Sequence, residues 1–256
     1  MTDRVDLNCD MGESFGAYHI GADDAVFPFI TSANVACGFH GGDPTVMRTT
    51  LVKARERGVA VGAHPGFPDL IGFGRRNMDV SPDEVYDLVV YQVGALMGAA
   101  RAAGMELQHV KPHGALYNMA AANRPLAAAI ARAVRDVDKQ LVLFGLPGSY
   151  LISEGQAAGL TTAGEAFADR NYMNDGSLVS RKRPDAQVHD ANEAVQRAIR
   201  MVREGKVCSI DGQDIALNVD TICLHGDGPH AAEFAQRLRA GFETAGVSVR
   251  PLGRAS

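Results

Sequence analysis

Short apolar runs alternate along the chain with longer segments in which apolar residues recur every three or four positions. A short apolar run predicts a buried strand, and the longer period predicts a helix with one apolar face. Repeated strand–helix units favour a parallel sheet joined by right-handed crossovers. The predicted strands are Val5–Cys9, Ser32–Ala36, Val59–Ala63, Gln108–Lys111, Gln140–Phe144, Leu160–Ala163 and Thr221–Leu224.

Capping residues mark the predicted helix boundaries. Ser81 is followed by Pro82 and Glu84, which is the pattern of a capping box with proline in the first turn. Gly104 stands where that helix must end, because glycine readily adopts the left-handed conformation of a C-terminal cap. Three further helices are predicted between Asp43 and Gly58, between Asp190 and Gly205, and between Pro229 and Gly246.

The number of units favours a closed barrel over an open sheet. About seven units fit into the 256 residues, and about 250 residues is typical of an eight-unit barrel. No linker or low-complexity segment divides the chain, so we expect a single domain over residues 1–256. The segment Arg170–Val188 has neither period and is expected to be a functional loop. The predicted fold class is α/β, a (β/α)7-type barrel.

Composition excludes several classes of protein. Lys and Arg number 25 against 30 Asp and Glu, a net charge of −5 that offers no basic surface to nucleic acid. No run of about 18 apolar residues could cross a membrane, and the beginning, MTDRVDLNCD, does not resemble a secretory signal. The four cysteines form no CxxC pair. We therefore expect a cytoplasmic protein that binds neither nucleic acid nor membrane.

Polar residues gather directly after the predicted strands, where ligands bind in parallel α/β folds. Four histidines there lie beside glycines, which let a backbone approach a ligand. The candidate catalytic residues are Asp10, Glu13, His40, His64, Lys111 and His113. The candidate residues for binding substrate or phosphate are Asn8, Asn34, Arg75, Arg76, Glu165, Arg170, His225 and Asp227.

Several of these residues also have a structural interpretation. Asp43 and Asp227 have a strong alternative interpretation as helix caps, and the basic segments Arg75–Arg76 and Arg181–Arg183 fit equally well as solvated turns. Asp10, His40 and His64 would suit a catalytic metal, although their spacing does not show that one binds. The chain contains no GxxxxGK[ST] loop, no strand-linked GxGxxG, no GxSxG and no HExxH.

Six segments carry a resemblance to a known family. They read DLNCDMGES (6–14), NVACGFHGGDP (34–44), GAHPGFPDLIGFGRR (62–76), VKPHGALYN (110–118), GEAFADRNY (164–172) and LHGD (224–227). In this order they closely resemble the LamB/YcsF family, and the resemblance extends from Val5 to about Pro251.

The resemblance implies a barrel like that of glycoside hydrolases and polysaccharide deacetylases. It also implies the A subunit of a 5-oxoprolinase, which works with B and C subunits. That enzyme opens the lactam of 5-oxo-L-proline to L-glutamate with cleavage of ATP, and Mg²⁺ is expected to accompany the ATP. We hypothesise that the amide oxygen is phosphorylated and that water then attacks the ring carbon. Lys111 with Arg75 or Arg76 would stabilise phosphate charge.

Asp10 or Glu13 with His64 would activate the water, and His40 or His113 would protonate the departing nitrogen. Two alternatives stay open. One is a metal-dependent deacetylase or amidohydrolase that acts alone, and the other is a subunit that binds substrate without catalysis. The conventional phosphate loop is missing, so the sequence does not decide where ATP binds.

Overall fold

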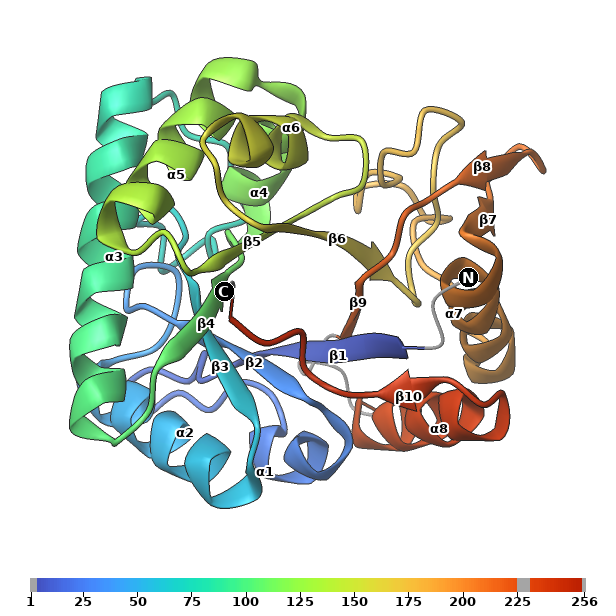
Figure 1. The fold of residues 1–256 in the computed structure, drawn as a ribbon, viewed down its shortest axis with the longest axis horizontal. Helices are drawn as coiled ribbons and strands as arrows, with labels where there is room; N and C mark the ends of the chain where they lie inside the picture. The colour runs from blue at the N-terminus through green and yellow to red at the C-terminus, as the bar shows by residue number, and fades with distance from the viewer. Residues whose placement is uncertain (1–3, 225–230, 255–256) are drawn as a thin grey trace.

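Seven parallel strands form a closed barrel with helices around it in a computed structural model that describes residues 4–224 and 231–254 (Figure 1). The strands follow one another in the order β1-β2-β3-β4-β5-β6-β9, and β9 pairs with β1 to close the barrel. This confirms the predicted (β/α)7-type barrel. The barrel strands are β1 (Arg4–Met11), β2 (Ser32–Ala36), β3 (Ala60–His64), β4 (Leu107–Val110), β5 (Val142–Gly145), β6 (Thr162–Phe167) and β9 (Thr221–Leu224).

Helices cover the outside of the barrel (Figure 1). They are α1 (Asp23–Val26) with the 3-10 turn η1 (Phe27–Phe29), α2 (Pro44–Arg57), α3 (Pro82–Ala102), α4 (Gly114–Ala122), α5 (Arg124–Val137), α6 (Tyr150–Ala157), α7 (Ala191–Glu204) and α8 (Ala231–Thr244). Among the described residues, three short strands lie outside the barrel. The antiparallel pair β7 (Lys206–Cys208) and β8 (Asp214–Ala216) follows α7, and β10 (Ser248–Val249) pairs with the beginning of β1.

The predicted caps are present where the structure describes them. Ser81 Oγ accepts a hydrogen bond from the Glu84 N–H, and Glu84 Oε2 accepts one from the Ser81 N–H at 2.7 Å, which completes the capping box of α3. Asp43 caps α2 through the N–H groups of Thr45 and Val46. The structural interpretation of Asp43 is thereby confirmed. The predicted start of the last helix at Pro229 lies outside the described residues.

Two strands begin two residues later than the apolar pattern predicts. The Leu160 N–H donates to the Gly155 carbonyl, so Leu160 closes α6 and β6 starts at Thr162. Likewise Gln140 belongs to a turn in which its N–H binds the Asp138 carboxylate, and β5 starts at Val142. Leu160 looks like the start of a strand because it is a buried apolar residue at the end of a helix, whereas Gln140 is exposed in the turn that precedes β5.

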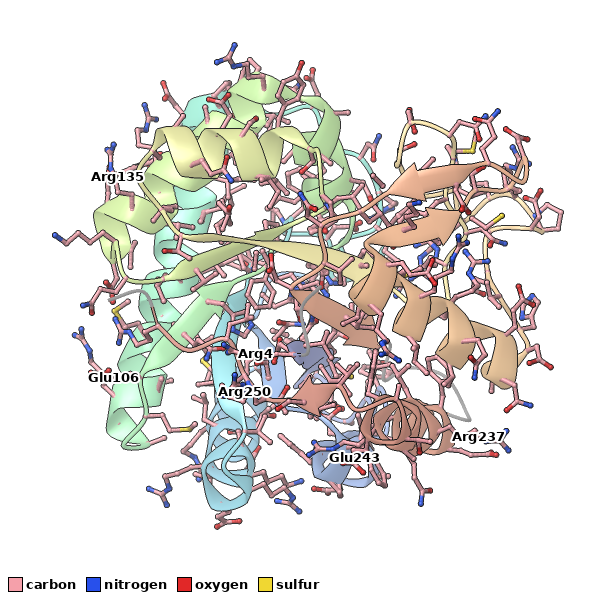
Figure 2. The ribbon with its side chains drawn as sticks, turned by 45° about the vertical axis from the view of Figure 1, so that its right-hand side comes forward. Arg4, Glu106, Arg135, Arg237, Glu243 and Arg250 are labelled. Atoms are coloured by element: carbon pink, nitrogen blue, oxygen red, sulfur yellow. The ribbon has the colours of Figure 1, made fainter. Side chains whose placement is uncertain are left out.

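Charged side chains lie on the outer surface of the helices (Figure 2). Arg237 pairs with Glu233 at 2.7 Å, and Arg239 pairs with Glu243 at 3.1 Å, one helical turn apart on α8. Such exposed pairs contribute at most about 1 kcal/mol each. No helix within residues 4–224 and 231–254 combines the length and the apolar character that a bilayer-crossing helix needs.

Candidate active site

The inside of the barrel is polar, because β1 alternates between two faces. Its apolar side chains pack toward the helices, whereas Asp6, Asn8 and Asp10 lie on the other face. Asp6 is fully buried inside the barrel near the beginning of β1. It accepts hydrogen bonds from the hydroxyls of Thr31, Ser32 and Thr221 at 2.6 to 2.7 Å. Burial raises the pKa of Asp6, although these hydroxyls oppose the shift.

The next layer consists of buried amides and one imidazole. Asn34 on β2 donates to Asn8 Oδ1 at 2.7 Å and to Asp10 Oδ1 at 2.9 Å. Its own oxygen lies 2.7 Å from His109 Nε2, which donates to it. The His109 ring stacks on Phe144 with 4.2 Å between centroids. Asn8 and Asn34 therefore hold Asp10 in place from inside the barrel.

Lys111, directly after β4, is the buried cation of the site. Its Nζ lies 2.8 Å from Asp10 Oδ1, 3.0 Å from Glu165 Oε1 and 2.9 Å from Cys223 Sγ. Burial alone would lower the pKa of Lys111, but Asp10, Cys223 and Glu165 raise it well above its ordinary value. The lysine therefore stays charged and keeps a positive charge beside Asp10.

The rings of His64 and His113 lie in contact, and one ring nitrogen of each is directed at a nitrogen of the other. His64 Nδ1 lies 2.7 Å from the Lys111 carbonyl oxygen, and His113 Nε2 lies 2.8 Å from the Phe73 carbonyl oxygen. A carbonyl only accepts, so both of these nitrogens carry hydrogen and the other nitrogen of each neutral ring does not. Those two nitrogens, His64 Nε2 and His113 Nδ1, are 2.9 Å apart. Such a contact requires a cation between them, either a proton or a metal ion.

Carboxylates surround this pair of histidines. Asp10 Oδ2 lies 3.3 Å from His64 Nε2, and Glu13 Oε1 lies 3.5 Å from His113 Nδ1 and 3.2 Å from His40 Nε2. The His40 ring stacks on that of His113 with 3.7 Å between centroids. Burial lowers the pKa of both His40 and His113 well below the ordinary value, and the neighbouring imidazoles add to this. Both rings are therefore neutral and available as ligands or bases.

The cluster fits a metal ion. One ligand atom from each of Glu13, His40, His64 and His113 lies within 4.8 Å of the others, and all four residues are buried. Three imidazoles and a carboxylate form a donor set that suits zinc and other first-row divalent metals. The opposed nitrogens of His64 and His113 support this fit, because a metal ion would satisfy both. The predicted set of Asp10, His40 and His64 overlaps with this cluster in its two histidines.

Two glycines let the histidines pack this closely. A Cβ on Gly66 would come within 2.6 Å of His40 Nδ1, and one on Gly74 would come within 2.7 Å of the His40 Cβ. Gly74 also has a φ of 61°, which favours glycine. Gln92 on α3 holds the Gly66 peptide by accepting from its N–H and donating to its carbonyl, both at 2.9 Å.

A small pocket of about 50 Å³ opens above Asp10, His64, Lys111 and His113. Arg75 and Arg181 line both this pocket and a cavity of about 900 Å³ beside it, so the two spaces adjoin. Arg170 also lines both, and its guanidinium donates to the carbonyls of Val179 and Ala186, which hold the loop over Arg170–Val188 in place. The loop expected to be functional therefore forms a wall of the cavity.

The structure brings most of the predicted site residues together. One connected cluster contains Asn8, Asp10, Glu13, Asn34, His40, His64, Lys111, His113 and Glu165. Arg76 differs, because it is largely exposed, pairs with Asp69 and lines only the outer cavity. The candidates His225 and Asp227 lie outside the described residues.

Sequence reasoning missed two residues of the site. Gln92 occupies a buried position in the apolar stripe of α3, and a glutamine at such a position is the signal that could have identified it. Cys223 gave no signal, because its contact with Lys111 joins residues 112 positions apart.

The sequence profile described as the LamB/YcsF family matches residues 5–256. The chain belongs to the LamB/YcsF family. It is 60% identical over 247 residues to a Bacillus licheniformis protein named as the A subunit of 5-oxoprolinase, covering 96% of this chain and 98% of that protein. A Bacillus subtilis protein of the same name is 58% identical over 246 residues, with 96% of each chain covered.

Solved structures show the same fold. The lactam utilization protein from Thermus thermophilus superimposes with a TM-score of 0.92 at 51% identity, covering 96% of this chain and 99% of that one. The catalytic domain of a peptidoglycan N-acetylglucosamine deacetylase from Eubacterium rectale aligns with a TM-score of 0.53 at 11% identity, over 98% of this chain and 89% of that chain. The second likeness concerns the fold alone.

Proposed function

We propose that this LamB/YcsF protein is the subunit of an ATP-dependent 5-oxoprolinase that opens the lactam of 5-oxo-L-proline to L-glutamate. The observation that carries the proposal is the 2.9 Å approach of His64 Nε2 and His113 Nδ1 to one another beside Asp10 at the mouth of the barrel. The names of the close relatives support the choice of substrate and imply partner B and C subunits.

The geometry supports general acid–base catalysis of water attack. His64 is held by the Lys111 carbonyl in the tautomer that leaves Nε2 free to take a proton from water. The water oxygen forms a bond to the lactam carbonyl carbon, the carbon–nitrogen bond breaks, and the proton passes to the departing nitrogen. His113, whose Nδ1 faces the same space, is placed to deliver it.

Positive charge beside the small pocket suits an amide substrate that also carries a carboxylate. Lys111, Arg75 and Arg181 line it, and they would stabilise the carboxylate of the substrate and the oxygen that becomes negative as water adds. ATP cleavage drives the reaction, because a five-membered lactam is a poor electrophile whose ring closure competes with opening. The terminal phosphoryl group passes from ATP to the amide oxygen with release of ADP, and water then adds to the ring carbon as the carbon–nitrogen bond breaks. A second water releases phosphate from the resulting acyl phosphate. Mg²⁺ would accompany the ATP.

The test is to incubate the purified chain with 5-oxo-L-proline, ATP and Mg²⁺, with and without co-expressed B and C subunits, and to measure glutamate and ADP. Glutamate formation that Asp10→Asn and His64→Ala each reduce at least a hundredfold would support the proposal. Lys139→Ala, an exposed residue outside the site, is the matched control. No glutamate in any combination, or turnover within a few-fold of wild type for both site variants, would refute it.

The donor set of Glu13, His40, His64 and His113 favours a second candidate, metal-dependent amide hydrolysis without ATP. A bound divalent metal would polarise the amide carbonyl and lower the pKa of a water molecule. This candidate predicts stoichiometric metal in the purified chain and hydrolysis of amides that chelators abolish in the absence of ATP. A metal-free preparation that retains full activity would exclude it.

A further inference from the structure

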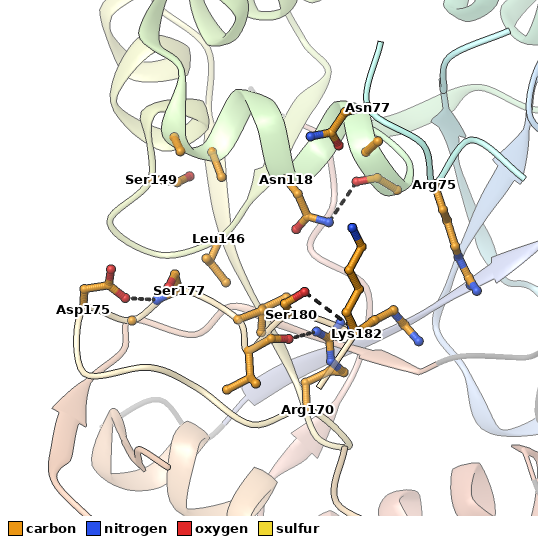
Figure 3. A pocket seen from close by; sticks show the side chains of 18 of the residues that line it. Arg75, Asn77, Asn118, Leu146, Ser149, Arg170, Asp175, Ser177, Ser180 and Lys182 are labelled. Atoms are coloured by element: carbon orange, nitrogen blue, oxygen red, sulfur yellow. Dashed lines mark hydrogen bonds between the residues drawn. The ribbon is translucent and has the colours of Figure 1, made fainter. Parts of the chain in front are cut away.

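Buried side chains on three neighbouring strands connect Asp6 to Asp10 by hydrogen bonds. β1 lies between β2 and β9 in the barrel wall (Figure 1), and the connection runs from Asp6 through Thr221 on β9, Asn8 on β1 and Asn34 on β2 to Asp10. We call these five residues the inner network. The first four are fully buried, and none of them lines the small pocket or the large cavity shown in Figure 3. Any effect they have on a reaction at the mouth of the barrel therefore passes through Asp10.

The charge of Asp6 fixes the direction of the first hydrogen bond. A carboxylate accepts hydrogen bonds and donates none, so the Thr221 hydroxyl donates its single hydrogen to Asp6 Oδ2 at 2.6 Å. The Thr221 oxygen is left with lone pairs, and it accepts from Asn8 Nδ2 at 2.7 Å. This contact decides which end of the Asn8 amide faces β9, because the NH2 group must lie at Thr221.

The orientation of Asn8 in turn fixes that of Asn34. Asn8 Oδ1 accepts from Asn34 Nδ2 at 2.7 Å, and the same NH2 group also donates to Asp10 Oδ1 at 2.9 Å. Asn34 Oδ1 accepts from His109 Nε2 at 2.7 Å, so both ends of this amide are engaged. If the amide were turned over, its oxygen would face the Asp10 carboxylate, and two acceptors would repel one another. The donor that Asp10 receives therefore depends on Asp6.

We propose that Asp6 and Thr221 are positioning residues, which set the direction of the hydrogen bonds that orient Asp10. The Asn34 NH2 group holds Asp10 Oδ1, and Asp10 Oδ2 is thereby placed 3.3 Å from His64 Nε2. The consequence for catalysis rests on the proposed function, in which Asp10 lies beside His64 as it takes a proton from water. The orientation of the two amides rests on the hydrogen bonds alone.

Ser32 offers a matched control for Thr221. Its hydroxyl also donates to Asp6, at 2.7 Å, but it is not part of the inner network. Ser32→Ala and Thr221→Val each remove one buried hydroxyl from Asp6, so both should lower thermal stability, whereas only Thr221→Val interrupts the connection to Asn8. Thr221→Ser keeps the hydroxyl and is the conservative variant that should behave like wild type.

The first measurement is the two-dimensional ¹H–¹⁵N NMR spectrum of the side-chain amides in the full chain. In Thr221→Val the NH2 resonances of Asn34 should shift, although the inner network reaches Asn34 from Thr221 only through Asn8. They should stay at their wild-type positions in Thr221→Ser and in Ser32→Ala, even though Ser32 lies on the same strand as Asn34.

The second measurement is glutamate formation by the complex with the B and C subunits. Thr221→Val should lower kcat about tenfold, the effect of one misdirected hydrogen bond to a charged group, and should leave KM within about twofold of wild type. Thr221→Ser should restore kcat, and Ser32→Ala should keep it within about threefold of wild type.

The outcomes separate the inner network from the reaction. Asn34 resonances that do not move in Thr221→Val, or that move equally in Ser32→Ala, would overturn the proposal. A shift of these resonances with unchanged kcat would overturn the positioning role. If the wild-type complex forms no glutamate, the proposed function fails, and the NMR comparison then decides by itself whether Thr221 directs the amides that hold Asp10.

Discussion

Acid should destabilise this protein partly through His109, a buried histidine inside the barrel. Burial, with smaller contributions from Lys111 and His64, lowers the pKa of His109 to about 3. In the unfolded chain the pKa would be about 6.5. As pH falls below 6.5 the unfolded state takes up a proton that the folded state does not bind until near pH 3, so stability is lost as pH falls through that window.

The magnitude at a given pH follows from how far that pH lies below the unfolded pKa of about 6.5. A pH of 5 lies about 1.5 units below the pKa of the unfolded histidine, and each unit corresponds to about 1.4 kcal/mol. Protonation of His109 in the unfolded state alone therefore lowers the free energy of unfolding by about 2 kcal/mol between about pH 7.5 and pH 5. The assay is urea unfolding followed by circular dichroism at half-unit pH steps. His109→Gln removes the titrating group and should reduce the loss over this range by about 2 kcal/mol.

The slope of the free energy of unfolding against pH, compared between variants, separates the effect of titration from that of packing. His109→Gln also loses the stack on Phe144, so its stability at neutral pH should fall, but that loss does not vary with pH. His189→Gln, which removes an exposed histidine outside the barrel core, is the matched control. A slope for His109→Gln identical to that of wild type would refute the reasoning, because it would mean that His109 titrates normally when folded.

Substitutions at three positions test the packing of the site by the free energy of unfolding in urea. Lys111→Met should cost about 3 to 5 kcal/mol, because it leaves the buried Glu165 and the half-buried Asp10 without their cation, and a loss below about 1 kcal/mol would contradict the ion pairs described. Gly62→Ala should cost about 1 to 3 kcal/mol, since its Cβ would overlap the His109 ring, and unchanged stability would show that the ring has room to move. Gln92→Leu should cost about 2 kcal/mol, because the buried Gly66 peptide loses both partners, whereas Gln92→Glu should still accept from the Gly66 N–H and lose less. Equal losses for the two Gln92 variants would argue against that contact.

Local signals in the sequence were sufficient for the barrel. The capping box at Ser81 and the caps at Asp43 and Asp190 act within three residues, so they can be identified without knowing the fold. The helices α4, α5 and α6 were not predicted individually. Alanine-rich α5 buries seven residues, and such a face is harder to distinguish by period than one built from larger side chains.

The sequence by itself indicated most of the residues that meet at the mouth of the barrel, because parallel strands place their carboxyl ends at one edge. Only the tertiary structure decided how they meet. The tautomers of His64 and His113 depend on the carbonyls of Lys111 and Phe73, and the two rings come from positions 49 residues apart. Contacts of that kind depend on strand register and loop path, and both arise when the whole chain packs, so no local pattern records them.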